Sequence, residues 1–374
     1  MDFDNLLQLL SAPTFLTWKM VVMMIAGGVL VYLGIAKDYE PVLLIPIGFG
    51  AILTNLPLTP ISSEHGLLGL MYEVGVKTEL FPLLIFIGVG AMTDFGPLLS
   101  NPKMALLGAA GQFGIFGTLM LALFLGFDIN ESASIGIIGA IDGPTSIYVS
   151  SKLAPHLLGP IAVAAYSYMS LVPIIQPPVM RLMTTDAERK VRMPYVEREV
   201  SHTTRILFPI VVTIIVSLIA PVASPLIATL MFGNLLRESG VVERLAKSAE
   251  NEIANVTTMF LGLAIGSTMV GAQFIQVDTM LILAMGLLAF VLDTVGGVLF
   301  GKIMYVLTNK RFNPLIGAAG ISAFPMSARV VQRVGQEYDP HNFLLMHAMG
   351  ANTAGQLGSV IAGSVVLSLL AGTF

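Results

Sequence analysis

The chain contains no cysteine, and charged residues make up only 11% of its 374 residues. The lack of cysteine excludes disulfide bridges, thiolate metal sites and thiol catalysis. Soluble domains carry about 25% charged residues. The shortage of charge, together with 55% hydrophobic residues and a mean hydropathy of +0.84, therefore indicates a polytopic membrane protein. A net charge of −4 does not indicate the basic surface with which proteins bind nucleic acid.

Two sequence motifs are also missing. There is no Gly-x-x-x-x-Gly-Lys-Ser/Thr run for nucleotide phosphates and no His-Glu-x-x-His pair for zinc. Any energy coupling must therefore come from an ion gradient or from a substrate that a partner protein delivers.

Hydrophobic runs dominate what is present, and several reach the length of about 20 residues that a spanning helix needs. The pattern predicts an all-α membrane protein with about 10–12 spans or half-spans. The predicted segments are 18–36, 41–57, 82–100, 104–127, 132–152, 157–182, 206–221, 223–236, 255–272, 277–308, 312–333 and 343–373.

A polar stretch rich in arginine and lysine, residues 183–205, separates residues 1–182 from residues 206–374. Short loops of this composition lie on the cytoplasmic side. The two flanking parts resemble each other: Ile138–Gly139–Ala140 matches Ile316–Gly317–Ala318 at an offset of 178, and two further matches have offsets of 183 and 174. Chance similarity between apolar sequences is the alternative. A true repeat with an odd number of spans would be inverted, with ion sites between broken helices.

Asp142 is the most informative single residue. It is the only charged residue between Glu131 and Lys152, within an apolar, glycine-rich stretch. A carboxylate at the centre of a membrane helix costs about 2.5–3.5 kcal/mol on insertion scales. The adjacent Gly143-Pro144 pair breaks the helix and frees backbone carbonyls. A broken helix around 139–145 that carries a carboxylate indicates cation handling.

The matching segment, residues 313–329, also contains proline, small residues and oxygen-bearing side chains. Asn313 and Ser322 add neutral oxygens to those of Asp142 and Thr145, and one carboxylate among neutral oxygens suits Na⁺ better than a divalent ion. Arg329 follows this segment, where it either holds an anionic substrate or extends to the cytoplasmic interface.

Two further elements carry candidate polar groups. Tyr166 and Tyr168 lie two residues apart on a helix and therefore on different faces, so at most one faces a given site. Both also fit an aromatic belt at the interface. Asn352 and Thr353 lie in a final helix of small residues, where they supply more oxygens or bond between helices.

Three runs carry a resemblance to a known family. DGPTSIYVSSKLAPHLLGPIAVAAYSYMSLVPIIQPPVM (142–180), FGNLLRESGVVERL (232–245) and NPLIGAAGISAFPMSARV (313–330) resemble the β subunit of the sodium-translocating biotin-dependent decarboxylases. The resemblance extends over nearly the whole chain. It implies a carboxybiotin decarboxylase that releases CO₂, consumes a proton and exports Na⁺.

The resemblance also implies roles for individual residues. It assigns catalytic roles to Asp142, Tyr168, Ser322 and Arg329, with Arg329 meeting carboxybiotin. The Na⁺ ligands that it implies are Asp142, Asn313, Gly317, Ser322, Tyr168 and Asn352. A first ion is expected at Asp142 with Asn313, and a second near Tyr168, Ser322 and Asn352. Tyrosine, whose side chain has a pKa of about 10 in water, is the expected proton donor to biotin.

The expected surroundings follow from the same resemblance. The cofactors are Na⁺ and carboxybiotin on a biotin carrier protein, and the partners are that carrier, a carboxyltransferase α subunit and a small membrane subunit. The chain is expected to be a homo-oligomer in the bacterial cytoplasmic membrane. Its short N-terminal part favours an acyl-CoA system, with glutaconyl-CoA ahead of methylmalonyl-CoA.

Two other functions are the alternatives. A secondary Na⁺-coupled transporter of an organic anion would use the same repeats and oxygens without any chemistry. A purely structural membrane subunit would need neither the broken helices nor a buried aspartate. Release of CO₂ from carboxybiotin in detergent, where no gradient exists, distinguishes the decarboxylase from the transporter.

Overall fold

The computed structural model describes residues 12–37, 39–63, 65–194 and 199–370. Every regular element in these ranges is a helix. The longer α-helices are α2 (Trp18–Lys37), α3 (Pro41–Thr54), α5 (Leu80–Met92), α8 (Phe113–Phe124), α10 (Gly143–Leu153), α11 (Leu158–Ser170), α12 (Val172–Met183), α14 (His202–Ile219), α15 (Ser224–Ser239), α17 (Ala254–Ser267), α19 (Val277–Leu307), α20 (Met326–Tyr338) and α21 (Leu345–Leu370). The short α-helices are α4 (Leu67–Met71), α6 (Gly96–Ser100), α7 (Ala105–Ala110), α9 (Ile129–Gly136), α13 (Asp186–Arg189), α16 (Glu243–Ser248) and α18 (Gly271–Phe274). The remaining 3₁₀ and π segments are η1 (Ala12–Phe15), η2 (Pro60–Ser62), η3 (Tyr72–Lys77), η4 (Pro102–Met104), η5 (Ile137–Ala140), η6 (Pro155–Leu157), η7 (Pro221–Ala223), η8 (Ala249–Ile253) and η9 (Pro314–Gly320).

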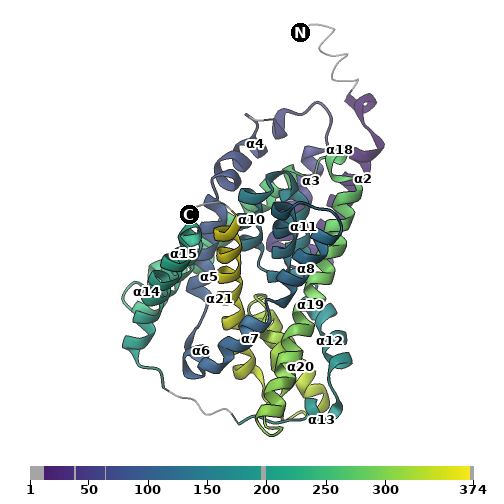
Figure 1. The fold of residues 1–374 in the computed structure, drawn as a ribbon. Helices are drawn as coiled ribbons and strands as arrows, with labels where there is room; N and C mark the ends of the chain where they lie inside the picture. The colour runs from purple at the N-terminus through teal and green to yellow at the C-terminus, as the bar shows by residue number, and fades with distance from the viewer. Residues whose placement is uncertain (1–11, 38, 64, 195–198, 371–374) are drawn as a thin grey trace.

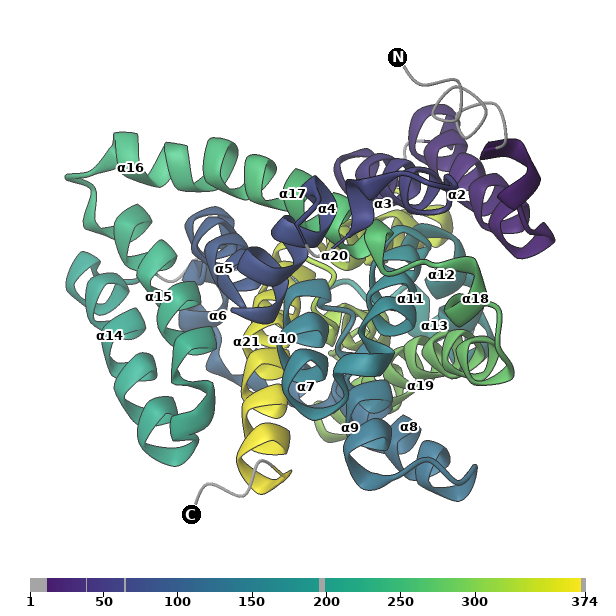
Figure 2. The same cartoon turned by 90° about the horizontal axis from the view of Figure 1, so that it is seen from above.

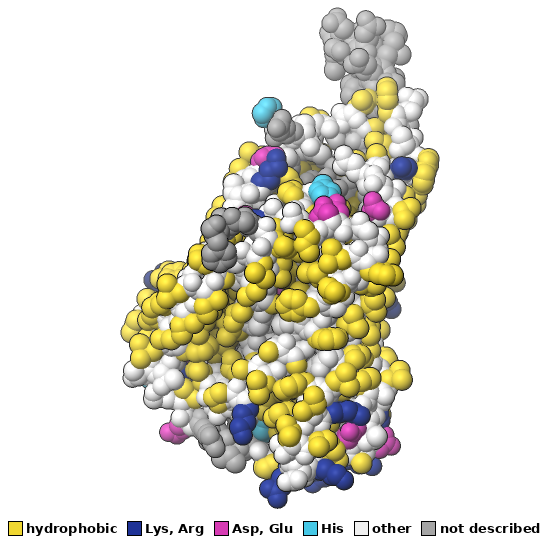
Figure 3. Space-filling model, in the orientation of Figure 1, with side chains coloured by type: hydrophobic (Ala, Val, Ile, Leu, Met, Phe, Trp, Pro, Cys, Tyr) yellow, Lys and Arg dark blue, Asp and Glu magenta, His cyan; other side chains and the backbone are white. Residues whose placement is uncertain are grey.

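The described helices confirm the prediction of an all-α, multi-pass membrane protein. Five of them, counting Pro102–Phe124 as one, are long and apolar enough to cross a membrane, or up to seven if each of two bent pairs is one span. The two pairs bend by 63° and 68°. Figure 3 shows a broad hydrophobic band, with most of the charged side chains in view gathered towards its two ends. This distribution fits a body that contacts lipid around its middle.

Helices from distant parts of the sequence pack around α19, whose predicted range of 277–308 is confirmed. It contacts α8, α11, α12 and the 3₁₀ helices η5 and η9. Figures 1 and 2 place α14 and α15 on one side of the molecule and α2 and α3 on the other, with α10, α11, α19 and α21 between them. The core thus brings the two interrupted segments of the sequence to one long helix.

Glycines set the close approach of α5 and α15. A Cβ added at Gly90 would lie 1.9 Å from the carbonyl oxygen of Leu230, and one added at Gly233 would lie 1.9 Å from that of Ile87. Both distances are far inside van der Waals contact, so the two backbones touch where the side chains are absent. Close backbone approach through small residues is how membrane helices associate without a hydrophobic driving force.

We expect Gly233→Ala to lower the thermal stability of the protein in detergent, because the new methyl group must push α5 and α15 apart. Overpacking of this kind costs about 1–3 kcal/mol. Gly28→Ala in α2 is the matched control, since no atom lies within 4 Å of an added Cβ there. The control should unfold at or slightly above the wild-type temperature, because alanine favours helix more than glycine. Equal stability of the two variants would contradict this packing.

Candidate functional site

Asp142 begins α10 at the first break in the chain. The helix α9 passes into η5, Ile141 then takes a left-handed conformation (φ 52°), and Asp142 is extended at the N-cap of α10. Pro144 stands in the first turn, where its missing N–H is not needed. A left-handed β-branched residue is rare and is found where the surroundings impose it, often at functional sites. The helix is therefore interrupted within residues 139–145, where the sequence places a break.

The Asp142 carboxylate is buried, with 4% of the residue exposed, and neutral groups surround it. Thr145 donates to it twice, from its hydroxyl at 2.7 Å and from its backbone N–H at 3.5 Å. From α21, the Gln356 amide donates at 3.1 Å and the Ser359 hydroxyl at 3.2 Å. No basic side chain in the described ranges forms an ion pair with Asp142. A cation or a proton is therefore needed to balance this charge in a low-dielectric interior.

The second break meets the first directly. Asn313 caps η9, and the chain from Ile321 to Pro325 then leads into α20. In this stretch the Ser322 hydroxyl donates to the carbonyl oxygen of Ala140 at 2.6 Å, across 182 residues of sequence. The Asn352 amide of α21 donates to the Ile321 carbonyl oxygen at 2.6 Å. The fold therefore gathers Asp142, Ser322 and Asn352 where the two broken segments meet.

Side-chain amides fix the backbone around the second break. Gln176 of α12 donates to the carbonyl oxygen of Ala318 at 2.6 Å. Gln112, at the junction of α7 and α8, donates to the carbonyl oxygen of Gly355 at 3.3 Å. The side-chain oxygens of Gln112, Gln176 and Asn352 are buried without a hydrogen-bond partner among the described residues. Because carbonyls hold the amide nitrogens, these oxygens point away as free acceptors of the kind that Na⁺ prefers.

The two tyrosines of α11 occupy different surroundings, as their spacing predicts. A Cβ on Gly143 would lie 2.0 Å from the ring of Tyr166, so that ring packs on the residue next to Asp142. The Tyr166 hydroxyl is buried and has no hydrogen-bond partner in the described structure. Tyr168 is partly buried, and its hydroxyl donates to the carbonyl oxygen of Leu283 in α19. Tyr166 is thus the tyrosine that packs beside Asp142.

Three predicted site residues lie apart from Asp142. Asn313 is at the start of η9, where its oxygen accepts from the Leu315 N–H at 3.0 Å and its amide nitrogen binds other carbonyls. Gly317 packs its backbone on Gly297, with 1.9 Å between an added Cβ and that carbonyl oxygen. Arg329 is exposed in the first turn of α20 and has no ion pair within the described residues. It is therefore available to an anionic group.

Sequence reasoning missed three polar residues of this region. Gln356 and Ser359 follow Asn352 at the i+4 and i+7 positions of α21, a spacing that puts all three on one helix face. Asp293 is a second fully buried carboxylate, which accepts from the Gly114 N–H in the middle of the membrane segment. It is the only charged residue between Asp278 and Lys302, the same signal that identified Asp142.

The described side chains include no group of three or more His, Asp or Glu residues that could hold a metal ion. The arrangement around Asp142 is instead one carboxylate, hydroxyls, amides and the carbonyls of broken helices. Such a set of hard oxygens with a single charge suits a monovalent cation.

Comparison with known proteins gives the family. The family described as Na⁺-transporting oxaloacetate decarboxylase beta subunit matches residues 19–370. Glutaconyl-CoA decarboxylase subunit beta of Acidaminococcus fermentans is 54% identical, over 95% of this chain and 94% of that protein. Methylmalonyl-CoA decarboxylase subunit beta of Propionigenium modestum is 53% identical, over 93% and 94%. The oxaloacetate decarboxylase beta chain of Klebsiella pneumoniae is 47% identical, over 92% and 94%.

These matches confirm the resemblance seen in the three sequence runs and favour decarboxylation over simple anion transport. The chain belongs to the β subunits of the Na⁺-pumping, biotin-dependent decarboxylases, which couple the decarboxylation of carboxybiotin to Na⁺ transport.

Proposed function

We propose that Asp142 is the Na⁺-binding carboxylate through which this chain couples carboxybiotin decarboxylation to Na⁺ export. The observation that carries the proposal is a buried carboxylate, without a basic partner in the described structure, where two broken helices meet. Thr145 and Ser359 add hydroxyl oxygens, and Gln356 supplies an oxygen if its amide turns. Na⁺ bound here replaces a proton as the counter-charge of Asp142.

A second ion position is proposed around Ser322 and Asn352. Ser322 donates to the carbonyl oxygen of Ala140, and Asn352 donates to that of Ile321. Both side chains therefore lie where the backbones of the two breaks meet in space. The predicted contributions of Tyr168, Gly317 and Asn313 remain proposals. Their present contacts are with α19 and with the connector between the two halves, so a direct role for them requires these contacts to change.

The chemistry proposed for the cytoplasmic end starts from Arg329. Its exposed guanidinium pairs with the carboxylate of carboxybiotin. When CO₂ leaves, the bond between the ureido nitrogen and the carboxyl carbon breaks, and its electron pair stays on the nitrogen. That nitrogen then takes a proton, for which Tyr168 is the predicted donor and Tyr166 the competitor beside Asp142. The proton comes from outside as Na⁺ leaves, so one two-state site exchanges both ions.

Two inverted halves, residues 1–182 and 206–374, are proposed to alternate access to this site, with residues 183–205 as a cytoplasmic connector. Paired helix contacts support the repeat. Gly50 of α3 lies on the carbonyl oxygen of Leu263 in α17, just as Gly233 of α15 lies on that of Ile87 in α5. Gly50 and Gly233 are also matched by the 183-residue offset in the sequence. Each break likewise consists of a 3₁₀ helix, a short irregular stretch and an α-helix.

The proposed assembly follows the names of the relatives. They are called subunit or chain beta, which supports a complex with a biotin carrier, a carboxyltransferase α subunit and a small membrane subunit. The relatives named for acyl-CoA substrates are 53–54% identical, and those named for oxaloacetate are 45–48% identical. This difference supports an acyl-CoA system, in a homo-oligomeric assembly of the bacterial cytoplasmic membrane.

Asp142→Asn is expected to abolish Na⁺ stimulation of CO₂ release from carboxybiotin by the purified complex in detergent. A hydrogen bond or contact to a charged group is worth about 1.5–3 kcal/mol. Loss of the charge should therefore weaken Na⁺ binding by at least about ten- to hundredfold, which removes the stimulation at Na⁺ concentrations that saturate the wild type. Glu243→Gln, which removes an exposed carboxylate paired with Lys247, is the control and should behave as wild type. Robust Na⁺-dependent activity in Asp142→Asn would remove Asp142 from the site.

Phenylalanine substitutions decide between the two tyrosines. The variant that lacks the proton donor should lose catalytic rate even at saturating Na⁺, because the hydroxyl that supplies the proton is gone. General acid catalysis contributes about 10²–10⁴-fold. Tyr166→Phe and Tyr168→Phe are compared by single-turnover CO₂ release across pH. Full activity of both variants would show that neither tyrosine donates the proton.

A further inference from the structure

The first part of the connector, residues 184–193, is bound closely to the body of the protein despite its polar sequence. Glu188 and Arg189 are buried, with 8% and 7% of each residue exposed. Lys302 of α19 lies 3.4 Å from the Glu188 carboxylate. We call residues 184–193 the proximal connector.

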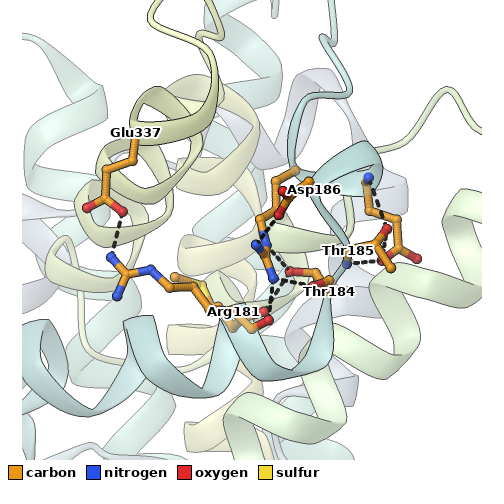
Figure 4. Close-up of polar contacts among 8 residues, drawn as sticks. Arg181, Thr184, Thr185, Asp186 and Glu337 are labelled. Atoms are coloured by element: carbon orange, nitrogen blue, oxygen red, sulfur yellow. Dashed lines mark hydrogen bonds and ion pairs between the residues drawn. The ribbon is translucent and has the colours of Figure 1, made fainter.

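Arg189 ties the proximal connector to the end of α12. Its guanidinium donates to the Thr184 hydroxyl at 2.9 Å and to the backbone carbonyls of Arg181 and Thr184. It also pairs with Asp186 at 2.7 Å and stacks 4.6 Å from the ring centre of Tyr338 in α20. Figure 4 shows Arg181, Thr184 and Asp186 grouped at this helix end, with Glu337 facing Arg181. The last carbonyls of a helix lack partners and attract cations, so Arg189 acts as a cap.

Two asparagines hold the backbone that follows Arg189. The amide nitrogen of Asn313 donates to the carbonyl oxygens of Arg189 and Val191 at 3.0 and 2.9 Å. The amide nitrogen of Asn342 donates to the same two oxygens, at 3.1 Å each. Both asparagines are fully buried. Each carbonyl oxygen has two acceptor positions, so this arrangement satisfies both.

The helix η9 connects these contacts to the cation site. Asn313 is also the N-cap of this seven-residue helix, through its bond with the Leu315 N–H. At the other end, Gln176 donates to the carbonyl oxygen of Ala318, and Ser322 donates to that of Ala140, two residues before Asp142. A 3₁₀ helix rises about 2 Å per residue, so η9 is a short rod fixed at both ends. Its start is held by the proximal connector through Asn313 and packs on α19, where a Cβ added at Gly301 would lie 2.5 Å from the carbonyl oxygen of Pro314.

We infer that the proximal connector is a clasp that positions η9, and that Asn342 and Arg189 are positioning residues for Na⁺ binding at the two breaks. This inference rests on the proposed function. Asn313 then acts on Na⁺ through the clasp, since both polar atoms of its side chain are hydrogen-bonded to backbone groups. Asn342 follows α20, and within the described residues its amide donates only to these two connector carbonyls, so its effect on the cation site is indirect.

The test uses the intact decarboxylase complex and measures CO₂ release against Na⁺ concentration. Asn342→Ala removes two hydrogen bonds, each worth a few-fold in an equilibrium constant, and is expected to raise the Na⁺ concentration for half-maximal activity about five- to thirtyfold. The rate at saturating Na⁺ should stay within about twofold, since the reacting groups are unchanged. Arg189→Lys, which keeps the charge but loses the planar fork, should shift the Na⁺ dependence in the same direction.

Asp339→Asn is the matched control. Arg192, just after the clasp carbonyls, pairs with Asp339 at 2.5 Å and lowers the pKa of that carboxyl to about 2, so the pair is ionised at neutral pH. This substitution breaks the Arg192 ion pair but keeps a side-chain oxygen for the His341 N–H and the backbone carbonyl that accepts from the Asn342 N–H. The hydrogen bonds of Asn313, Asn342 and Arg189 therefore stay in place, and the Na⁺ dependence should be that of the wild type. Asn342→Ser, which retains one donor, should fall between the wild type and Asn342→Ala.

Several results would overturn the clasp. One is an unchanged Na⁺ dependence in Asn342→Ala and Arg189→Lys, with or without a lower rate. Another is an equal shift in Asp339→Asn. A third is the loss of assembled complex in all three clasp variants, which would assign these contacts to folding alone. A wild-type complex without Na⁺-dependent CO₂ release would instead contradict the proposed function. That failure is seen in the wild type, whereas failure of the clasp inference is seen only in the variants.

Discussion

The structure depends on one electrostatic constraint, the burial of the Asp142 carboxylate without a basic partner among the described residues. In a membrane interior such a charge must be balanced, and the surrounding hydroxyls and amides can solvate an ion without neutralising it. A salt bridge would have fixed the charge permanently. Neutral partners leave the counter-ion free to change, which is what an exchange of Na⁺ for a proton requires.

The breaks in the two helices also help to balance the buried charge of Asp142, because they bring backbone oxygens near its carboxylate. A continuous helix keeps its carbonyls in its own hydrogen bonds, whereas a 3₁₀ helix followed by an irregular stretch releases carbonyls from the helical pattern near the carboxylate. Irregular backbone at this depth needs other partners, and Ser322, Asn352, Gln112 and Gln176 supply them. The polar residues around the breaks therefore stabilise the interruption as well as shape the site.

Some of this could be predicted from the sequence because one residue stood out from its neighbours. Asp142 and the Gly143-Pro144 pair contradict an apolar run, so the break and its charge were evident. Gln356 and Ser359 were missed because only the packing of α21 on α10 brings them to Asp142. The choice between Tyr166 and Tyr168 depends on the rotation of α11, which local sequence does not determine. Asn313 looked like a ligand by residue type, yet its hydrogen bonds join it to a connector more than a hundred residues away.

The most direct test of the central claim is Na⁺ binding to the purified chain in detergent, measured by calorimetry in buffers of different ionisation enthalpy. Binding at one buried carboxylate predicts that the wild type releases protons as it takes up Na⁺, and that its affinity falls as the pH is lowered. Asp142→Asn should lose both the binding and the proton release. Na⁺ binding of wild-type strength in that variant, or binding without proton release in the wild type, would contradict the account.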